Sequence, residues 1–200
     1  MANISASQVK ELRERTGAGL MDCKRALVET DGNIDTATEV LQKKAAAKAV
    51  KRMDRAASEG TVTSYIHGQG RIGVLLELNS ETDFVARNDA FQDLSREICL
   101  HIAATGAKFI SREDVPEESR NKQAEIFRGQ AIEEGKPEAF VGKIIDGRMD
   151  KWLAEICLNE QPWFRNSDQT VAEVMQQHIA KIGENLKIRR FVRWELGESL

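Results

Sequence analysis

Apolar residues recur every three or four positions near the start of the chain, which is the spacing of one face of an α-helix. Three short helices are expected: one after the capping box Ser5–Gln8, one over Leu20–Thr30 and one after the N-cap Asn33. Gly17 and Gly32 lie between them as helix stops. The expected inward residues are Val9, Leu12, Leu20, Cys23, Leu27, Ile34, Ala37 and Leu41. This pattern favours a small helical bundle.

The third helix is expected to continue through residues 43–52, a stretch rich in alanine and lysine. Alanine favours the helix but buries little surface, so the stretch is typical of an exposed helical connector. Its lysines leave two interpretations open. A solvated linker is favoured, and the alternative is a basic surface that meets an acidic partner or phosphate.

The next segments alternate between apolar and polar residues, which is the period of a strand with one buried face. Strands are expected at Thr61–His67 and Arg71–Leu78, joined by a turn at Gly68–Gly70. The glycines of this turn and Gly73 also match the spacing G-x-G-x-x-G. That dinucleotide-binding motif needs a helix where a second strand is expected here, so nucleotide binding is not favoured. The inward residues of the second strand are Ile72, Val74, Leu76 and Leu78.

Helical signals dominate the middle of the chain. Asn88 is a suitable N-cap for a helix that Gly106 ends. Pro116 and Pro137 suit the first turns of two further helices, and the short connection between these makes them antiparallel neighbours. We therefore expect a helical hairpin over about 116–155, with the charged outward faces of a projecting arm. The expected inward residues of the helix after Asn88 are Phe91, Leu94, Ile98 and Ile102.

The C-terminal part begins with the loop Gln161–Phe164, which carries two adjacent aromatic residues. These cover the core in the favoured interpretation, or form a contact site in the other. Thr170–Glu173 is a second capping box, and the helix that it opens is expected to end at Gly183. Leu186–Leu196 alternates as a third strand. The residues expected to share one of its faces are Ile188, Val192 and Trp194.

The stretch Asn79–Asp89 connects the second strand to the next helix and carries Phe84 between charged neighbours. Such surface connections hold functional residues disproportionately often. An aromatic side chain at this place is not obviously needed by the core. Phe84 is therefore a candidate binding residue.

The composition, with 41% apolar and 30% charged residues in a chain of 200, is that of a soluble globular protein. The net charge of −3 disfavours a general nucleic-acid binder, so no direct nucleic-acid contact is expected. The start lacks a secretory-signal pattern, and no apolar run approaches membrane-spanning length. Three cysteines far apart in sequence fit reduced thiols, so a cytoplasmic protein without a membrane partner is expected.

Candidate catalytic groups are few. His101 and His178 are interpreted as hydrogen-bonded core histidines. No pair among these two and His67 has metal-ligand spacing along one helix. Phosphate-loop, nucleophile-elbow and zinc-protease motifs are missing from the sequence. No catalytic residue, cofactor or metal is therefore expected, and a binding protein is favoured over an enzyme that would use Cys157 or His178. The carboxylates near Phe84, interpreted as a solvated acidic surface, are Glu77, Glu81, Asp83, Asp89 and Asp93.

Two stretches, Leu12–Leu27 and Thr82–Asn88, are far more specific than these patterns. They resemble the signatures of elongation factor Ts, the guanine-nucleotide exchange factor of bacterial and organellar translation. The resemblance covers nearly the whole chain in the expected order. Further segments that agree with it are Gly147–Met149, Gln161–Pro162 with Thr170–Val171, and Lys181–Asn185 leading to Arg189–Arg190.

The resemblance implies an α+β fold in three parts. Residues 1–43 are expected to form a three-helix bundle of the ubiquitin-associated (UBA) type, and residues 44–58 a basic helical linker. Residues 59–200 are expected to form a dimerisation and Tu-binding core with a small three-stranded antiparallel sheet and helices. The hairpin at about 116–155 is then a coiled-coil arm inserted into that core.

The implied partner is elongation factor Tu in its GDP form, whose magnesium and phosphate site the factor perturbs. The motif T-D-F presses into the GTPase domain in the family, a role that falls here on Asp83 and Phe84. The second helix of the bundle touches the same domain, and Met21 lies off the inward face of that helix. The implied contact residues are Thr82, Asp83, Phe84 and Val85 with Leu20, Met21 and Lys24.

Longer members of the family carry two copies of the sheet module, whereas one copy is expected in this chain. A surface made of two modules then needs two chains, so a homodimer is expected. The alternative function is a peptide-binding helical module built on the N-terminal bundle, without exchange activity.

Overall fold

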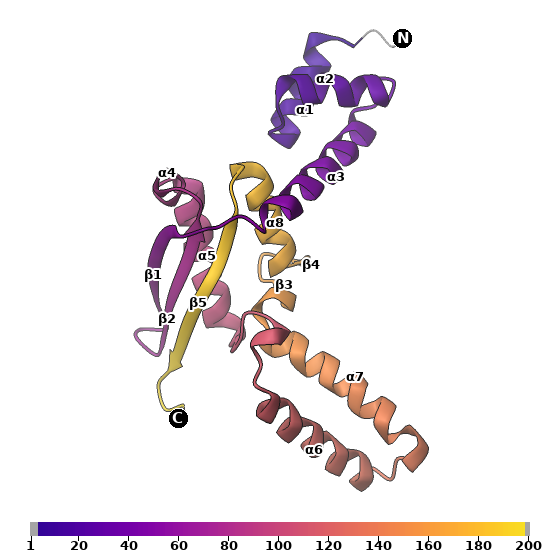
Figure 1. Cartoon of the computed structure of the whole chain (residues 1–200), viewed down its shortest axis with the longest axis vertical. Helices are drawn as coiled ribbons and strands as arrows, with labels where there is room; N and C mark the ends of the chain where they lie inside the picture. Colours follow the sequence, from indigo (N-terminus) through magenta and orange to yellow (C-terminus); the bar gives the residue numbers. More distant parts are fainter. Residues whose placement is uncertain (1–3, 199–200) are drawn as a thin grey trace. The chain divides into compact units, whose positions relative to one another are not determined.

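The structure, a computed structural model, describes residues 4–198 (Figure 1). These residues divide into two compact units. The first holds the residues up to Gly60 together with Ser80–Val85 and Met175–Lys187. The second holds Thr61–Asn79, Ala86–Val174 and the residues from Ile188 onward. The fold combines helices with a small antiparallel sheet and is of the α+β class.

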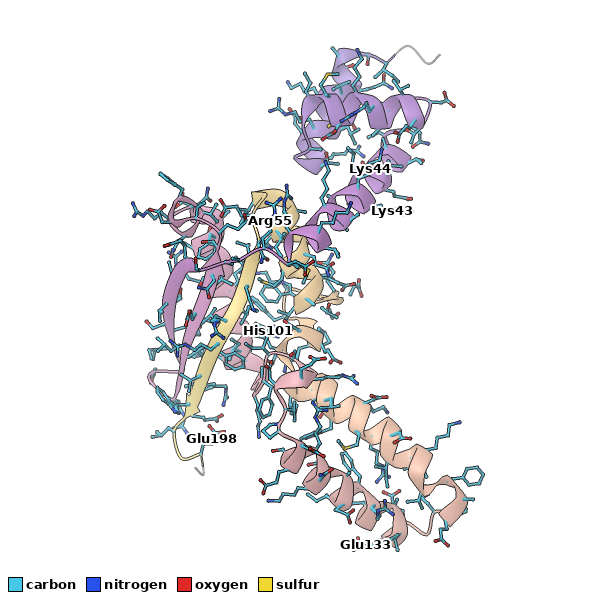
Figure 2. All side chains as sticks on the ribbon, in the orientation of Figure 1. Lys43, Lys44, Arg55, His101, Glu133 and Glu198 are labelled. Carbon is cyan, nitrogen blue, oxygen red and sulfur yellow. The ribbon has the colours of Figure 1, made fainter. Side chains whose placement is uncertain are left out.

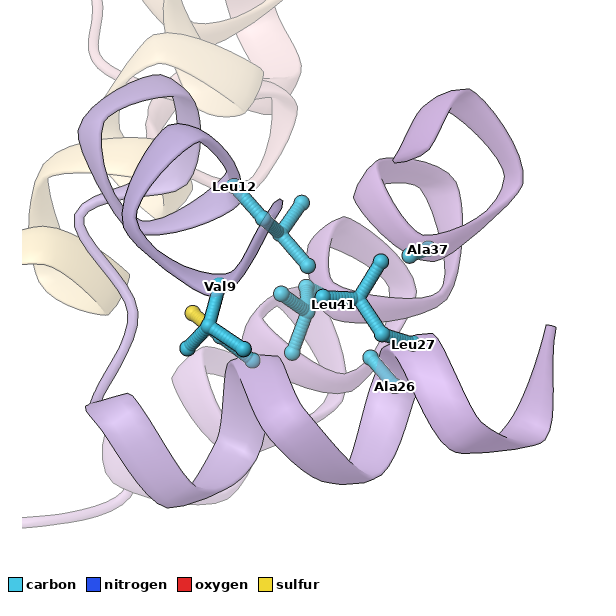
Figure 3. Close-up of a cluster of buried hydrophobic side chains, with 7 residues drawn as sticks. Val9, Leu12, Ala26, Leu27, Ala37 and Leu41 are labelled. Atoms are coloured by element: carbon cyan, nitrogen blue, oxygen red, sulfur yellow. The ribbon is translucent and has the colours of Figure 1, made fainter. Parts of the chain in front are cut away.

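The first unit begins with three helices, α1 Ala6–Thr16, α2 Leu20–Glu29 and α3 Ile34–Arg52. Ser5 and Gln8 form the predicted capping box, and the side chain of Asn33 caps α3. Figure 3 shows the apolar side chains that meet between the three helices. The three predicted helices and their caps are thus confirmed. Their common core consists of Val9, Leu12, Cys23, Ala26, Leu27, Ala37 and Leu41.

Leu20 was expected on the inward face of α2, but it is 56% exposed, whereas Cys23 and Leu27 on that face are fully buried. Leu20 is the first residue of the helix, after the N-cap Gly19. Because helical side chains lean toward the N-terminus of their helix, the first one projects past the packed segment. Helical periodicity alone does not predict that the first residue of a helix is exposed.

The alanine-rich stretch continues α3 to Arg52 without a break, as predicted. Lys44, labelled in Figure 2, pairs with Glu29 at 2.7 Å. Lys48 lies 3.9 Å from Asp22. A hydrogen bond from Arg25 and the charge of Lys48 lower the pKa of Asp22. Exposed pairs of this kind contribute only about 0–1 kcal/mol to stability. The favoured interpretation, a solvated helix, fits these contacts.

The main sheet has the strand order β1 Glu59–His67, β2 Ile72–Ser80, β5 Leu186–Glu195. β1 and β2 form the predicted hairpin, and Gln69 and Gly70 in its turn have positive φ. β5 runs antiparallel to β2, because the Leu196 N–H donates to the Arg71 carbonyl while Arg190 pairs with Glu77. A strand, not a helix, therefore follows the glycines of the G-x-G-x-x-G pattern.

One face of the sheet packs on α5 Asp89–Thr105. The hydroxyls of Thr63 and Ser95 lie 2.6 Å apart, and the Cys99 thiol donates to the Thr63 carbonyl. Asn88 caps the helix, and Gly106 ends it with φ of 69°, as predicted. The predicted inward residues that are buried here are Val74, Leu76, Leu78, Phe91, Leu94, Ile98 and Ile102.

The residues of β5 that were predicted to share one face differ in burial: Ile188 is 6% exposed, whereas Trp194 is 63% exposed. Arg190 pairs at 2.6 Å with Glu77, which alternates with buried residues of β2 and so lies on the outer face. Trp194 is four positions from Arg190 in the same strand and therefore lies on the outer face as well. That Ile188 shares this face stays a prediction.

Two helices, α6 Glu117–Glu133 and α7 Glu138–Ile156, form the predicted helical hairpin. They pack through Ala131, Val141 and Ile145. Pro116 and Pro137 are the N-caps of the two helices, one position before the expected first turn. Both helices thus begin where the prolines predict, within the usual uncertainty of a helix end.

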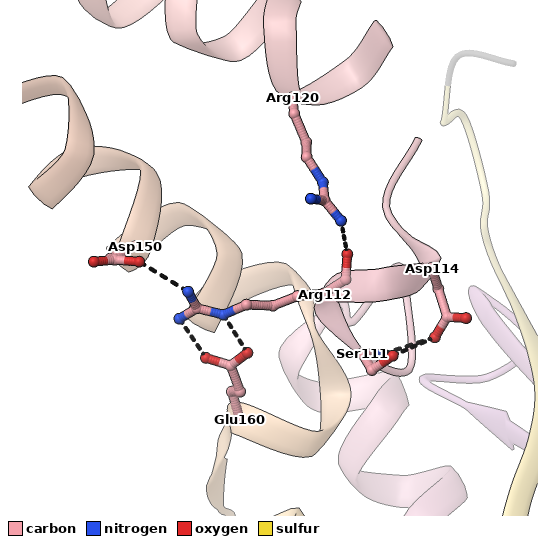
Figure 4. Close-up of polar contacts among 6 residues, drawn as sticks. All are labelled: Ser111, Arg112, Asp114, Arg120, Asp150 and Glu160. Carbon is pink, nitrogen blue, oxygen red and sulfur yellow. Dashed lines mark hydrogen bonds and ion pairs between the residues drawn. The ribbon is translucent and has the colours of Figure 1, made fainter. Parts of the chain in front are cut away.

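Arg112 ties the base of this hairpin together (Figure 4). Its guanidinium donates two hydrogen bonds to Glu160, at 2.6 and 2.7 Å, and a third to Asp150 at 2.8 Å. Arg120 donates to the Arg112 carbonyl. The bonds to Glu160 and Asp150 raise the pKa of Arg112, which therefore stays charged.

The expected loop at Gln161–Phe164 contains a short strand, β3 Pro162–Trp163, paired antiparallel with β4 Asn166–Thr170. Trp163 is 5% exposed and stacks on His101, with 5.1 Å between the ring centroids. Core cover, the favoured interpretation, is confirmed for Trp163. The predicted capping box at Thr170 then opens α8 Val171–Ile182.

His101 is a buried core histidine, as predicted, whereas His178 is only half-buried. The His101 Nε2 lies 3.0 Å from Oε1 of Gln161, an amide oxygen that can only accept, so Nε2 carries the proton. Burial lowers the pKa of His101. The folded chain therefore holds this imidazole neutral.

Because the folded chain takes up the His101 proton at lower pH than the unfolded chain, whose ordinary pKa is 6.5, stability should fall as the pH drops from about 7.5 to 5.5. We expect the Tm to decrease by a few degrees over this range. His101→Gln, which cannot titrate, should flatten the Tm–pH curve even where it lowers the Tm throughout. Equal slopes for both chains would contradict this prediction.

Candidate functional site

The connection between β2 and α5 folds into a single helical turn, α4 Asp83–Ala86. Phe84 in this turn is 80% exposed, more than any other large apolar side chain among residues 4–198. Leaving such a side chain in water forgoes roughly 1.5–3 kcal/mol of burial free energy. Fold stability therefore does not explain an aromatic side chain at this position.

All the polar groups of Thr82 are hydrogen-bonded. Its N–H donates to Glu184 Oε2 at 3.0 Å, and its hydroxyl donates to Glu184 Oε1 at 2.7 Å. The same hydroxyl oxygen accepts from the Val85 N–H at 3.4 Å, and the Thr82 carbonyl accepts from the Ser80 hydroxyl at 2.9 Å. Thr82 therefore caps α4 and also anchors it to Glu184.

The Glu184 carboxylate belongs to the turn at 183–185, between α8 and β5. The backbone N–H of Asn185 donates to Glu81 Oε1 at 2.6 Å. Its side-chain amide donates to the carbonyls of Met53, at 3.1 Å, and Arg55, at 2.6 Å, just after α3. Arg55 also pairs with Glu81 at 3.4 Å. One turn thus binds both the segment before α4 and the end of α3.

The acidic residues around Phe84 are largely paired with arginines. Glu77 pairs with Arg190, Glu81 with Arg55 and Asp93 with Arg96. Asp83 and Val85, the other predicted contact residues of the segment, are half-buried. The arrangement is an ion-paired surface, which agrees with the interpretation that no acid–base pair operates here.

The second group of predicted contact residues lies exposed on α2. Leu20 is 56% and Met21 63% exposed, and Lys24 is exposed beside them. Met21 and Lys24 also line a shallow groove with Arg25, Val28 and Glu29. Val28, which is 54% exposed, was not among the predicted contact residues.

The residues that sequence reasoning missed are those that hold the Thr82 segment, above all Glu184 and Asn185. Both lie in Lys181–Asn185, a segment that contributed to the family resemblance without a role. Glu184 is 102 residues from Thr82 in sequence, and no local pattern pairs two residues so far apart.

The described residues 4–198 contain no group of three or more His, Cys, Asp or Glu side chains arranged to hold a metal ion. No helix in that range has the length and apolar character needed to cross a membrane.

Comparison with known proteins agrees with the motifs. Residues 9–198 match the family model described as elongation factor TS. The chain belongs to the elongation factor Ts family. The elongation factor Ts of Desulforamulus reducens is 54% identical over 200 residues, covering 100% of this chain and 92% of the relative. That of Carboxydothermus hydrogenoformans is 54% identical over 197 residues, covering 98% and 91%. That of Caldanaerobacter subterraneus subsp. tengcongensis is 52% identical over 197 residues, covering 98% of both chains.

Membership of the elongation factor Ts family confirms the resemblance inferred from Leu12–Leu27 and Thr82–Asn88, both of which lie inside the matched range. The chain is thereby a member of a family of translation elongation factors.

The three cysteines of this elongation factor Ts family member are buried free thiols. Burial raises the pKa of Cys99 to about 12, and burial with the charge of Glu160 raises the pKa of Cys157. A nucleophilic thiol is instead accessible and has a lowered pKa. The enzyme hypothesis based on Cys157 therefore has no support in the geometry.

We expect the thiols to react slowly with a disulfide reagent in the folded chain at pH 8, and all of them to react at once after unfolding in guanidinium. The measurement is the rate of thiolate release at 412 nm with and without denaturant. A Cys157 that reacts rapidly in the folded chain would restore the enzyme hypothesis.

Proposed function

We propose that this chain is a guanine-nucleotide exchange factor that binds elongation factor Tu in its GDP form and accelerates GDP release in the cytoplasm. The observation that carries the proposal is Phe84, 80% exposed on an anchored segment that matches the family motif T-D-F. The names of the relatives, elongation factor Ts, support the same assignment.

Such a factor needs no catalytic chemistry of its own. A GTPase holds Mg²⁺ and the phosphates with a loop of backbone donors and a few oxygen ligands. Moving this framework by about 1 Å weakens several contacts together. Insertion of Phe84 supplies apolar contact that stabilises the shifted arrangement, and Asp83 supplies a carboxylate that competes for polar partners. Thr82 and Val85 set the loop.

The second contact with the GTPase domain is made by Leu20, Met21 and Lys24 on α2. Two exposed apolar side chains beside a lysine suit a partner surface that is apolar with an acidic rim. This contact adds affinity, while the Thr82–Val85 segment acts on the nucleotide site.

Thermodynamic linkage determines the order in which GDP is released and the factor is displaced. If factor binding weakens GDP binding by some ratio, GDP weakens factor binding by the same ratio. The factor therefore promotes GDP release and is displaced when GTP binds.

The remaining structural expectations belong to the same proposal. We assign the UBA type to the bundle at 1–43, a linker role to 44–58 and a Tu-binding core to 59–200. The hairpin α6–α7 is assigned as a coiled-coil arm. Its packing through Ala131, Val141 and Ile145 supports that assignment.

Release of a fluorescent GDP analogue from Tu, measured by stopped flow, tests the exchange function. The wild-type chain should accelerate release at catalytic concentration. Phe84→Ala should lower kcat/KM about 30-fold, the effect of roughly 2 kcal/mol lost at a contact hot spot. Phe140→Ala, which truncates a phenylalanine that is 59% exposed on the hairpin, is the matched control and should retain wild-type activity. No acceleration by the wild type would favour the peptide-binding module instead.

A homodimer is proposed to form through the outer face of the main sheet. Val62 and Ile66 of β1, Leu75 of β2 and Trp194 of β5 are all exposed on this face. An added Cβ at Gly73 would lie 3.5 Å from Ile66, so the β1 and β2 side chains are neighbours there. Large contiguous apolar patches are uncommon on monomers. A second copy of the same face would cover this one isologously, as two sheets pack in a sandwich.

Light scattering after size exclusion tests the dimer. The wild-type chain should elute with twice the mass of one chain, and Trp194→Glu should give a folded monomer because it buries a charge in the proposed contact. Ile132→Glu makes the same kind of change at a residue that is 64% exposed on the hairpin, and should leave the dimer intact. A monomeric wild type, or a dimer that survives Trp194→Glu, would contradict this assignment.

A further inference from the structure

We infer that Glu184 is a positioning residue for nucleotide exchange: its carboxylate holds Thr82 and thereby fixes the segment that presents Phe84. The inference rests on the proposed exchange function and names a residue outside the segment on which that function depends.

The segment cannot hold itself in place. α4 is one turn, and a single helical turn is unstable alone because nucleation fixes several dihedrals for one hydrogen bond. Phe84 contributes no burial, being 80% exposed. The order of the segment must therefore come from contacts made by its other residues.

Glu184 supplies the contact at the start of the turn. One carboxylate oxygen accepts the Thr82 N–H at 3.0 Å, and the other accepts the Thr82 hydroxyl at 2.7 Å. A bidentate contact of this kind fixes direction as well as distance. It also orients the hydroxyl so that its oxygen faces the Val85 N–H and caps α4. The rotation of α4, and hence the direction of Phe84, follows from this pair.

Glu184 is itself held by the residues on both sides of it. Gly183, with φ of 90°, ends α8 just before it. Asn185, which is 2% exposed, follows it and is bound to Glu81, Met53 and Arg55. The carboxylate is thus presented from a fixed turn, and the Thr82 segment is fixed through it.

Loss of Glu184 should act on the exchange step more than on binding. The contact of α2 with the partner does not involve this turn, so the affinity that it supplies should remain. Misplacing a functional group by about 1 Å can cost up to 100-fold in rate. We therefore expect Glu184→Ala to lower kcat for GDP release 10- to 100-fold, with KM changed much less.

The experiment measures GDP release with the full-length variants Glu184→Ala, Glu184→Gln, Phe84→Ala and the double variant Phe84→Ala/Glu184→Ala. Glutamine keeps one acceptor oxygen, so Glu184→Gln should give an intermediate rate. In the Phe84→Ala chain, Glu184→Ala should have little further effect, because the side chain that it positions is gone. Glu198→Ala removes the same charge from an exposed side chain and serves as the control.

Amide exchange followed by NMR provides a readout that does not depend on activity. Glu184→Ala should reduce protection at Thr82 and Val85, with the amides of α3 and α5 unchanged. General loss of protection would mean that the alanine variant does not fold, and Glu184→Gln then carries the test.

Three results would overturn the inference. In the first, Glu184→Ala releases GDP at the wild-type rate while Phe84→Ala is slow, which leaves the exchange function intact. In the second, Glu184→Ala lowers the rate of GDP release equally in the wild-type and Phe84→Ala chains, which means that Glu184 acts elsewhere. In the third, the amide of Thr82 keeps its protection in Glu184→Ala. Failure of the wild-type chain itself to release GDP would instead refute the proposed function.

Discussion

A side chain reserved for a partner cannot stabilise its own segment by being buried. Phe84 is 80% exposed, so the segment that carries it must be ordered by polar contacts along the backbone. The structure meets this constraint at Thr82, whose N–H, hydroxyl and carbonyl are all bonded. Because the main partner, Glu184, lies between α8 and β5, the segment is ordered only when that turn is in place.

The apolar side chains that stabilise the fold are different from those that are exposed and free to contact a partner. On α2, Cys23 and Leu27 are buried while Leu20 and Met21 face water. The main sheet likewise buries one face against α5 and exposes Trp194 on the other. Since exposed apolar groups contribute little to folding, substitutions there can change contact without changing the fold.

The elements that the sequence predicts well are those with local physical causes. Ser5, Asn33 and Thr170 cap helices by bonds to residues three positions away, and Gly106 ends one through its positive φ. The failures have non-local or end-specific causes. Leu20 is exposed because it opens its helix, and β3 is too short to show a period. The contact of Thr82 with Glu184 joins residues 102 apart, so the sequence identifies the contact segment but not its support.

The anchoring of Thr82 has a thermodynamic consequence for exchange. A factor shifts a GTPase away from its GDP-bound arrangement only by its difference in affinity for the two arrangements. A mobile segment would adapt to both arrangements of the GTPase. Part of its binding free energy would also be lost in ordering the segment itself. With the bonds to Glu184 already formed in the free chain, Phe84 has one direction and fits one arrangement better than the other. Under the proposed exchange function, the rigidity of this segment, rather than the size of its contact, would set the ratio by which GDP binding is weakened.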